Sequence, residues 1–350
     1  MLDIFTYHKF SENRSENLAR SIYNQRISDS LHIYKEHKDS FKERNCPFCD
    51  SSVYDSIDKF QESYGVSKCK RCSSTFVNPV PSIAALEDYY NNCKCNHMLQ
   101  DLYRNRNKIK NYIINDRVKE AAKCILNISK KNKGKISVLE VGCGSGAFLS
   151  QLRNYFEVSY NNDVVDIEYN GIDIDCHAIS KCVSKHINLD CCSIEEYSDN
   201  KSKEYDLIFH FELIEHLKDP ALLMQKTHNL LKDEGVLLFT TQNSNGLEMM
   251  ASNYNSYRIL AHSIFPPMHL NAFSTTNILH FALRNGFNLR DLTTPGRLDV
   301  DMVTITSDFI KDKVFKEISN LDKKNKGLLQ NVISKLMCSS HMQCVLTKHN

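Results

Sequence analysis

Four cysteines near the N-terminus have the spacing of metal ligands. Cys46 and Cys49 form one C-x-x-C pair, and Cys69 and Cys72 form a second pair after nineteen intervening residues. This spacing is typical of structural zinc sites, in which each pair supplies two thiolates to one tetrahedral ion. Four sulfur ligands leave no position for a reactive water, so the predicted role is structural. The quartet therefore indicates a small zinc ribbon over residues 46–80, with two chance pairs of reduced cysteines as the alternative.

Most of the other cysteines are scattered singly through apolar segments, where a free thiol behaves as a small hydrophobic side chain. Cys93 and Cys95 lie in the sequence NNCKCNH, whose spacing does not complete a second metal site. They are expected to be free thiols. A disulfide framework is not expected, because such frameworks belong mainly to short secreted chains.

A glycine-rich turn is the second feature with chemical potential. Gly142, Gly144 and Gly146 lie in LEVGCGSGAF, between an apolar segment and an amphipathic one. Glycines at a strand-to-helix turn let a ligand approach the backbone closely. The spacing G-x-G-x-G differs from the dinucleotide fingerprint G-x-G-x-x-G, and the preceding acid Glu140 would repel a phosphate. Glu140 instead suits a cationic ligand, such as the sulfonium and amino group of S-adenosylmethionine.

The elements that must position these residues are strands and helices in alternation. From residue 136 onward, continuous apolar segments alternate with amphipathic ones. This pattern predicts a parallel sheet that helices cover on both faces. We therefore expect an α/β fold with a Rossmann-like, doubly wound sheet of seven strands. Six of these strands are expected at ISVLEVG, EYNGIDI, EYDLIFHFE, GVLLFTTQN, GFNLRDLTTPG and HMQCVLTKH.

The expected organisation has four parts. A helical N-terminal extension, the zinc ribbon, and a helical linker and lid precede the main domain, which carries a helical insertion near its end. The boundaries follow from the cysteine pairs, the prolines in FVNPVPS and the polar stretch KKNKGK. The parts are residues 1–45, 46–80, 81–135 and 136–350, with the insertion near residues 300–337.

Residues 136–348 resemble a class I S-adenosylmethionine-dependent methyltransferase, and the motifs match residue by residue. The segment from Glu140 to Gly146 resembles the glycine-rich first motif, which lies under the methionine part of the cofactor. Asp173 resembles the acid that binds both ribose hydroxyls, with Asp175 as the competing candidate, and CCSIEEY resembles the segment that flanks the adenine. The resemblance implies that the last strand is antiparallel. It also implies cofactor contacts from Glu140, Gly142, Gly144, Gly146, Asp173, Ile174, Ser193, Ile194 and His210.

Two histidines resemble residues of the family's catalytic site. His216 lies in ELIEHLKDP, which resembles the E-x-x-E-H-x-x-x-P stretch common in this superfamily. His269 lies in PPMHLNAFSTTN, which is similar to a segment of zinc-ribbon sugar C-methyltransferases whose histidine is catalytic. The resemblance makes His269 the first candidate for a general base or acceptor contact, and His216 the second. Structural roles in a loop and at a helix start are the respective alternatives.

The sequence departs from this family at two positions. Met268 stands where the sugar C-methyltransferases have an acidic residue, and Gln242 replaces the proline of a T-P-N segment. Tyr89 and Tyr90, at the end of a predicted helix, are expected either to contact the acceptor or to pack in the core.

The order of the motifs also resembles methyltransferases encoded with bacterial surface-polysaccharide pathways. This resemblance implies a sugar, nucleotide-linked sugar or surface glycan as acceptor, with S-adenosylmethionine and structural Zn²⁺ as cofactors. A second interpretation is RNA methylation with the ribbon as docking module, but the formal net charge of +2 makes nucleic acid the less favoured partner. A third is a non-catalytic scaffold that binds the cofactor.

Apolar runs of the length needed to span a membrane, about 20 residues, are absent from the sequence. The first thirty residues are polar and contain no apolar core of a secretory signal. A cytoplasmic location is therefore expected. The sequence carries no indication of an oligomeric state.

Overall fold

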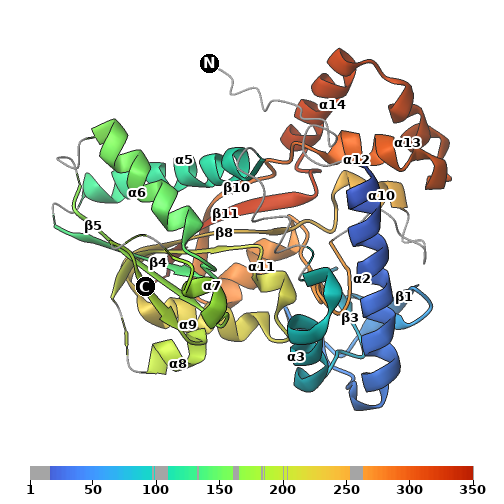
Figure 1. Cartoon of the computed structure of the whole chain (residues 1–350), viewed down its shortest axis with the longest axis horizontal. Coiled ribbons are helices and arrows are strands. Elements are labelled where there is room, and N and C mark those ends of the chain that lie inside the picture. The colour runs from blue at the N-terminus through green and yellow to red at the C-terminus, as the bar shows by residue number, and fades with distance from the viewer. Residues whose placement is uncertain are drawn as a thin grey trace.

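The structure is a computed structural model that describes residues 16–96, 98, 109–131, 134–160, 165–182, 184, 186–199, 201–202, 204–252 and 263–349. It contains one sheet of seven strands and a smaller sheet of four strands (Figure 1). The long helix α2 (Glu16–His37) packs beside the small sheet. Within the described ranges, no helix is both long enough and apolar enough to cross a membrane.

The large sheet has the strand order β10-β11-β8-β7-β4-β5-β6. Strands β4 to β8 are parallel to one another, whereas β11 is antiparallel to both β8 and β10. This confirms the predicted seven-stranded, doubly wound sheet with an antiparallel last strand. Ligands of such sheets bind at the carboxyl ends of the strands where the order reverses, which here lies between β4 and β7. The strands are β4 (Ile136–Val141), β5 (Ile167–Asp173), β6 (Asn188–Cys191), β7 (Tyr205–Phe211), β8 (Leu231–Gln242), β10 (Phe287–Thr293) and β11 (His341–Lys348).

Alternate residues of the central strands pack into separate apolar clusters on the two faces of the sheet. Leu139 and Ile208 face one cluster, whereas Val138 and Leu207 face the other. Helices α8, α9 and α11 close the first face, and α5 and α6 close the second (Figure 1). Because both faces are buried, these strands have continuous apolar sequences. The helices are α5 (Ile109–Ser129), α6 (Ala147–Tyr160), α7 (Cys176–Ile179), α8 (Ile194–Asp199), α9 (Pro220–Leu230) and α11 (Asn277–Arg284).

The small sheet joins the N-terminal part of the chain to the main domain. Its antiparallel strands β1, β2 and β3 are extended by β9, which follows β8 in the chain. Phe48 packs edge-to-face on Phe273, with ring centroids 4.4 Å apart. A third apolar cluster, which includes Ile33, Tyr64 and Tyr89, holds α2 and α3 on this sheet. The elements are η1 (Lys38–Ser40), β1 (Tyr54–Phe60), β2 (Tyr64–Cys69), β3 (Thr75–Val77), α3 (Ile83–Asn92) and β9 (Asn271–Ala272).

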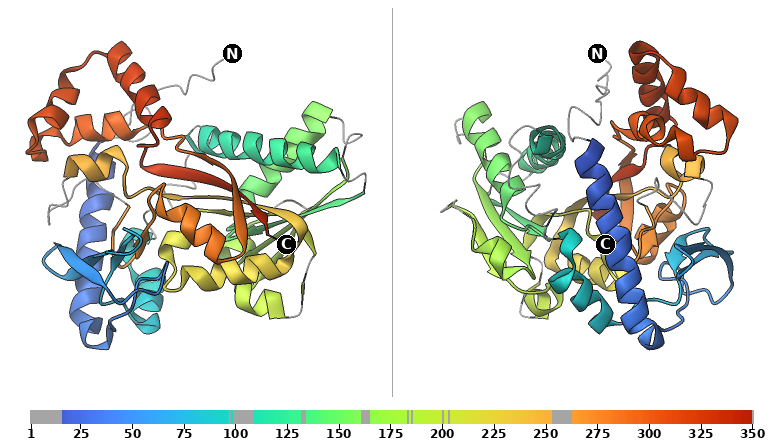
Figure 2. Two further views of the ribbon diagram at one scale, coloured as in Figure 1. Left: turned by 180° about the vertical axis from the view of Figure 1, so that it is seen from behind. Right: turned by 45° about the vertical axis from the view of Figure 1, so that its right-hand side comes forward.

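A helical insertion separates β10 from β11 and packs against α10 through a fourth apolar cluster (Figure 2). Buried Asp299 links the start of the insertion to its end, because its carboxylate accepts hydrogen bonds from Gln330 Nε2 at 2.7 Å and from the backbone nitrogen of Ser340 at 2.6 Å. Residues 1–15 of the expected extension and 99–108 of the expected linker lie outside the described residues. The elements are α10 (Leu247–Ser252), α12 (Asp299–Ile305), η3 (Ser307–Phe309), α13 (Lys313–Glu317), η4 (Ile318–Asn320) and α14 (Lys323–Lys335).

Candidate functional site

The glycine-rich turn lies at the carboxyl end of β4, between β4 and α6. Gly142, Gly144 and Gly146 have φ angles of +77°, +54° and +70°, which favour glycine over residues with a side chain. A Cβ added to Gly144 would have no described heavy atom within 4 Å apart from its chain neighbours. The backbone of the turn is therefore open at this point, which leaves room for a ligand.

Asp173, at the end of β5, fixes this turn. Its Oδ2 accepts a hydrogen bond from the Gly144 backbone nitrogen at 2.7 Å, and its Oδ1 accepts one from the Asp175 backbone nitrogen at 2.8 Å. Asp175 instead caps α7, because its Oδ1 accepts from the Ala178 backbone nitrogen at 2.9 Å. Of the two competing acids, Asp173 is thus the one that faces the glycine turn.

Glu140 lies within β4 beneath the turn and is 5% exposed. Its Oε2 has no hydrogen-bond partner among the described residues. Burial raises the pKa of Glu140 well above its usual range, while the nearby charge of Arg117 acts in the opposite direction. Because a buried carboxylate oxygen without a partner costs free energy, this position favours a ligand that brings a positive charge or a hydrogen-bond donor.

The segments that follow β5 and β6 lie side by side, as the resemblance to methyltransferases implies. The backbone nitrogen of Cys192 donates to the Asp173 carbonyl at 3.1 Å. Ile174 is 77% exposed, whereas Ile194 is buried in the core. Ser193 begins α8, and its hydroxyl accepts from the backbone nitrogen of Glu196. Of the two isoleucines among the expected cofactor contacts, Ile174 therefore offers the exposed apolar surface.

A disulfide between Cys176 and Cys191 joins these two segments, with Cα atoms 5.1 Å apart. Both cysteines are exposed. The expectation that the scattered cysteines are free thiols is wrong for this pair, because the end of β6 brings Cys191 beside the start of α7. The pairing could not be read from the sequence, where fifteen positions separate the two residues.

His210 is enclosed in the interior of β7. Its ring is fully buried and stacks on Phe239 with centroids 4.6 Å apart. Neither ring nitrogen has a hydrogen-bond partner within the described part of the chain, and burial lowers its pKa to about 3. Its side chain therefore belongs to the neutral core below the glycine turn, although the sequence motif suggested a cofactor contact.

The two candidate catalytic histidines lie close together at the carboxyl edge of the large sheet. They are on the opposite side of this edge from the segments that the disulfide joins. The rings of His216, in η2 (Ile214–His216), and His269 have centroids 4.7 Å apart. Glu215 between them is fully buried, and burial raises its pKa well above its usual range, with the charge of Glu212 adding to the effect. Burial lowers the pKa of His216 to about 4. The structure thus brings together two residues that are 53 positions apart in the printed sequence.

The two neighbouring tyrosines of α3 have different surroundings. The Tyr90 side chain is 40% exposed, and its hydroxyl lies 3.0 Å from His216 Nδ1. Tyr89 is 1% exposed, and its hydroxyl lies 3.4 Å from Cys95 Sγ. Tyr90 therefore belongs to the histidine cluster, whereas the position of Tyr89 favours the packing role that was the alternative.

A second polar cluster lies beside the histidines and was missed in the sequence. Glu212 has a φ of +52°, and its Oε1 accepts from Thr240 Oγ1 at 2.7 Å and lies 3.4 Å from the Arg117 guanidinium. Its Oε2 accepts from Gln242 Nε2 at 2.6 Å and lies 3.4 Å from His341 Nε2. Gln242, which replaces the family's proline, thus supplies a hydrogen bond that proline lacks.

Charge couples the members of this cluster. Burial acts to lower the pKa of His341, but the carboxylate of Glu212 raises it to about 9. Burial acts to raise the pKa of Glu212, but His341 and Arg117 hold it well below its usual range. The Arg117 guanidinium also lies over the Phe211 ring, 4.6 Å from its centroid. Glu212, which begins the E-x-x-E-H stretch, and Gln242, which replaces the family's proline, had a sequence signal, whereas Arg117 and His341 had none.

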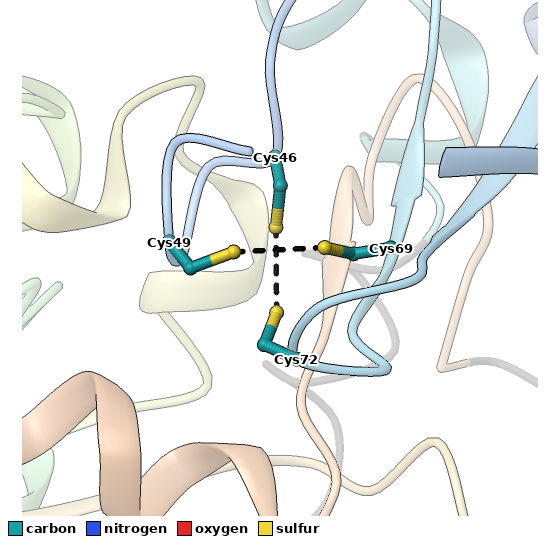
Figure 3. A group of neighbouring side chains, drawn as sticks. All are labelled: Cys46, Cys49, Cys69 and Cys72. Atoms are coloured by element: carbon teal, nitrogen blue, oxygen red, sulfur yellow. Dashed lines mark hydrogen bonds between the residues drawn. The ribbon is translucent and has the colours of Figure 1, made fainter. Parts of the chain in front are cut away.

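The four cysteines of the ribbon converge on one point (Figure 3). The Sγ atoms of Cys46 and Cys72 are 3.5 Å apart, as are those of Cys49 and Cys69, and all four lie within 4.8 Å of one another. A tetrahedral zinc ion with Zn–S bonds of about 2.3 Å requires sulfur separations of about 3.8 Å. The quartet is therefore compatible with zinc, and it lies against the main domain through the Phe48–Phe273 contact.

Two identical backbone turns shape the quartet. Asp50 donates its backbone N–H to the Cys46 carbonyl at 2.8 Å, and Ser73 donates to the Cys69 carbonyl at 3.0 Å. Each donor residue has a positive φ, +57° and +59° respectively. The matching geometry means that each pair presents its sulfurs in the same way, as expected for two halves of one metal site.

Curated relatives of the chain include two ubiquinone biosynthesis O-methyltransferases. The protein from Neisseria meningitidis serogroup C (strain 053442) is 27% identical over 109 residues, which cover 31% of this chain and 44% of that protein. The protein from Coxiella burnetii (strain Dugway 5J108-111) is 32% identical over 117 residues, which cover 32% of this chain and 46% of that protein. The chain spans about half the length of the curated relatives it matches.

Solved structures of methyltransferases resemble the chain at low sequence identity. A SAM-dependent methyltransferase from Archaeoglobus fulgidus is 16% identical with a TM-score of 0.41, covering 68% of this chain and 94% of that one. The plantazolicin methyltransferase BamL is 16% identical with a TM-score of 0.46, covering 76% and 94%. Because both scores are below 0.5, the fold is established by the strand order of this chain and by its family.

The family is given by a sequence model described as a methyltransferase domain, which matches residues 113–292. This match covers just over half of the 350 residues and includes the glycine turn, Asp173 and the E-x-x-E-H stretch. The chain therefore belongs to the methyltransferase domain family.

Proposed function

We propose that the protein is an S-adenosylmethionine-dependent methyltransferase whose acceptor is a sugar, a nucleotide-linked sugar or a related glycan. The observation that carries the proposal is the site at the carboxyl end of β4, in a chain of the methyltransferase family. There the buried Glu140, with one oxygen lacking a hydrogen-bond partner among the described residues, lies under an open glycine turn that Asp173 fixes. When bound, the cofactor supplies a methyl group on a positively charged sulfur.

The residues of the chain have to hold the donor and align the acceptor for an in-line displacement. Glu140 supplies a negative charge for the amino group and sulfonium of the donor. Each carboxylate oxygen of Asp173 accepts one backbone hydrogen bond and retains acceptor capacity for a ribose hydroxyl. Ile174 offers the base an exposed apolar surface.

The proposed position of the acceptor is at the histidine cluster and the Glu212 cluster. Both lie at the carboxyl edge of β7 and β8, near the glycine turn, since a Cβ added to Gly142 would lie 3.4 Å from Leu213. A hydroxyl-rich acceptor suits this edge, because Glu212, His341 and Tyr90 offer charged and neutral hydrogen-bonding groups. The resemblance to zinc-ribbon sugar methyltransferases supports the same choice. His269 and His216 are its proposed catalytic residues.

Zinc in the cysteine quartet is proposed as a structural ion. Four thiolates close its coordination sphere, and the quartet anchors the small sheet that contributes α3 and Tyr90 to the acceptor side. A cytoplasmic location is proposed with this function, since the donor and nucleotide-linked sugars are made in that compartment.

Calorimetric titration with S-adenosylmethionine and, separately, with NAD tests the cofactor. Saturable one-site binding of S-adenosylmethionine alone is expected, and no binding by folded, zinc-loaded protein would contradict the proposal. Transfer of a labelled methyl group to nucleotide-linked sugars then tests the acceptor. Transfer to RNA, with binding that weakens steeply as salt increases, would favour the RNA interpretation instead. Cofactor binding without transfer to any acceptor would favour the scaffold.

A further inference from the structure

Three side chains with metal-ligand atoms converge at the acceptor end of the large sheet. One carboxylate oxygen of Glu215, one ring nitrogen of His216 and one of His269 lie within 4.8 Å of one another. Glu215 and His216 come from η2, whereas His269 precedes β9. This group is separate from the cysteine quartet, and the glycine turn does not use it.

Hydrogen bonds hold the segments of this group in place. The backbone nitrogen of Leu270 donates to the Glu215 carbonyl at 2.9 Å, which joins the two segments directly. The Tyr90 hydroxyl lies 3.0 Å from His216 Nδ1 and so gives one ring nitrogen of His216 a partner. Metal-binding histidines usually hydrogen-bond through their second ring nitrogen, and Tyr90 fills that place for His216.

Glu215 carries the strongest indication of a missing partner. Its side chain is fully buried, and its Oε2 accepts from Thr241 Oγ1 at 2.9 Å. Its Oε1 has no hydrogen-bond partner in the described part of the chain. A buried carboxylate with an unpartnered oxygen costs free energy, which a bound cation offsets.

We propose that Glu215, His216 and His269 bind a divalent transition-metal ion at the acceptor site. One carboxylate and two imidazoles form a donor set that suits Zn²⁺, Mn²⁺ or Fe²⁺, whereas Mg²⁺ and Ca²⁺ prefer oxygen ligands. Bonds of about 2.1 Å require ligand atoms about 3.4 Å apart, so the present spacing of up to 4.8 Å has to shorten when an ion binds. Three protein ligands leave positions on the ion for hydroxyl oxygens.

The role of the ion in catalysis rests on the proposed function. A hydroxyl of the acceptor that binds the ion loses its proton to water more readily. Its oxygen then bonds to the methyl carbon as the carbon–sulfur bond breaks, and the sulfonium becomes a neutral thioether. The two histidines act as ligands in this arrangement rather than as proton acceptors. Two neighbouring hydroxyls fit the open positions best, so the site selects acceptors with a vicinal diol.

Binding of Co²⁺ to the full chain, after a chelator has removed bound metal, tests the site. We expect two ions per chain, one for each cluster. The cysteine quartet gives intense sulfur-to-cobalt charge-transfer absorption, and the second site gives only weak visible bands. The variant His269→Ala is expected to lose one ion and keep the charge-transfer bands, whereas the exposed control His280→Ala keeps both ions. One ion per wild-type chain, or two in His269→Ala, would overturn the proposal.

Glu215→Gln is the second variant, because it keeps the size of the buried side chain and removes its charge. We expect it to weaken binding of the second Co²⁺ ion by more than about 10- to 100-fold, which is the loss typical of a change outside the ligand shell. Unchanged affinity would overturn the proposal. Titration with S-adenosylmethionine on the same samples keeps the two hypotheses apart. A wild-type chain that binds two Co²⁺ ions but no S-adenosylmethionine supports the metal site and contradicts the proposed function.

Discussion

Replacing Asp173 is the most direct perturbation of the cofactor site. Its two carboxylate oxygens accept from the backbone nitrogens of Gly144 and Asp175 at 2.7 and 2.8 Å, which ties the glycine turn to the segment after β5. In the proposed complex the same oxygens accept from two ribose hydroxyls. Asp173→Ala therefore removes both ribose contacts and also releases the turn that shapes the site.

The expected loss of affinity follows from these contacts. A hydrogen bond to a charged group contributes about 1.5–3 kcal/mol, so two ribose contacts contribute about 3–6 kcal/mol if they are additive. Contacts to one carboxylate are coupled, and water replaces part of them, so we expect the lower end of this range. A loss of about 3 kcal/mol weakens binding by at least about 100-fold.

Calorimetric titration with S-adenosylmethionine measures this effect. Asp175→Ala is the matched control, because it removes an acid two positions away that only caps α7. We expect the control to lower the unfolding free energy by about 1 kcal/mol and to leave the affinity within about threefold of wild type. Wild-type affinity in Asp173→Ala, or an equal loss in the control, would refute the assignment of Asp173.

Three further predictions concern the ribbon, the disulfide and the acceptor side. Cys69→Ser removes one of four thiolates, so we expect loss of bound zinc and a lower melting temperature, measured by metal analysis and scanning calorimetry. Cys176→Ser opens the loop that the bond to Cys191 closes, with a sequence separation of 15, and we expect about 3 kcal/mol less stability in denaturant unfolding under oxidising conditions. Burial acts to lower the pKa of His341 but Glu212 raises it to about 9, so this histidine stabilises the folded state at lower pH. The contribution is fully present below about pH 6.5 and is lost as the pH rises through about 9, so the gap in unfolding free energy between wild type and His341→Gln should shrink over that range.

Each of these predictions has an outcome that would contradict it, and the first two also have a control. Cys338→Ser removes an unpaired cysteine outside the ribbon and should keep the zinc, whereas zinc retained by Cys69→Ser would rule out the quartet as its site. Reduced wild type should unfold like Cys176→Ser, and equal midpoints in oxidised samples would contradict the stabilising disulfide. A gap that stays constant with pH would show that the charge of His341 is not coupled to Glu212.

Features defined by short segments could be predicted from the sequence. The cysteine quartet and the glycine turn depend on spacing within a few tens of residues, and strands buried on both faces have continuous apolar sequences. The edge strand β6 had no such pattern, because its residues NLDC are mostly exposed. The burial of His210 could not be predicted for a related reason, since its position in a family motif gave no information on its surroundings.

Features that depend on distant contacts could not be predicted. Arg117, Glu212 and His341 come from three elements, and only the sheet order brings them together at one edge. The Cys176–Cys191 bond likewise depends on β6 lying beside β5. His216 and His269 were both chosen by resemblance, but their contact depends on the backbone bond between Leu270 and Glu215.

The pairing of β3 with β9 ties the folding of the ribbon to that of the main domain. Residues 78–270 separate the two strands, and Thr75 pairs with Ala272 while Phe76 pairs with Asn271. During synthesis the first three strands and the cysteine quartet emerge long before the fourth strand. Such long-range pairing forms slowly, so the ribbon spends this interval with an open edge that only the late arrival of β9 closes. A ribbon expressed on its own would keep that edge exposed, and the natural unit for expression is therefore the whole chain.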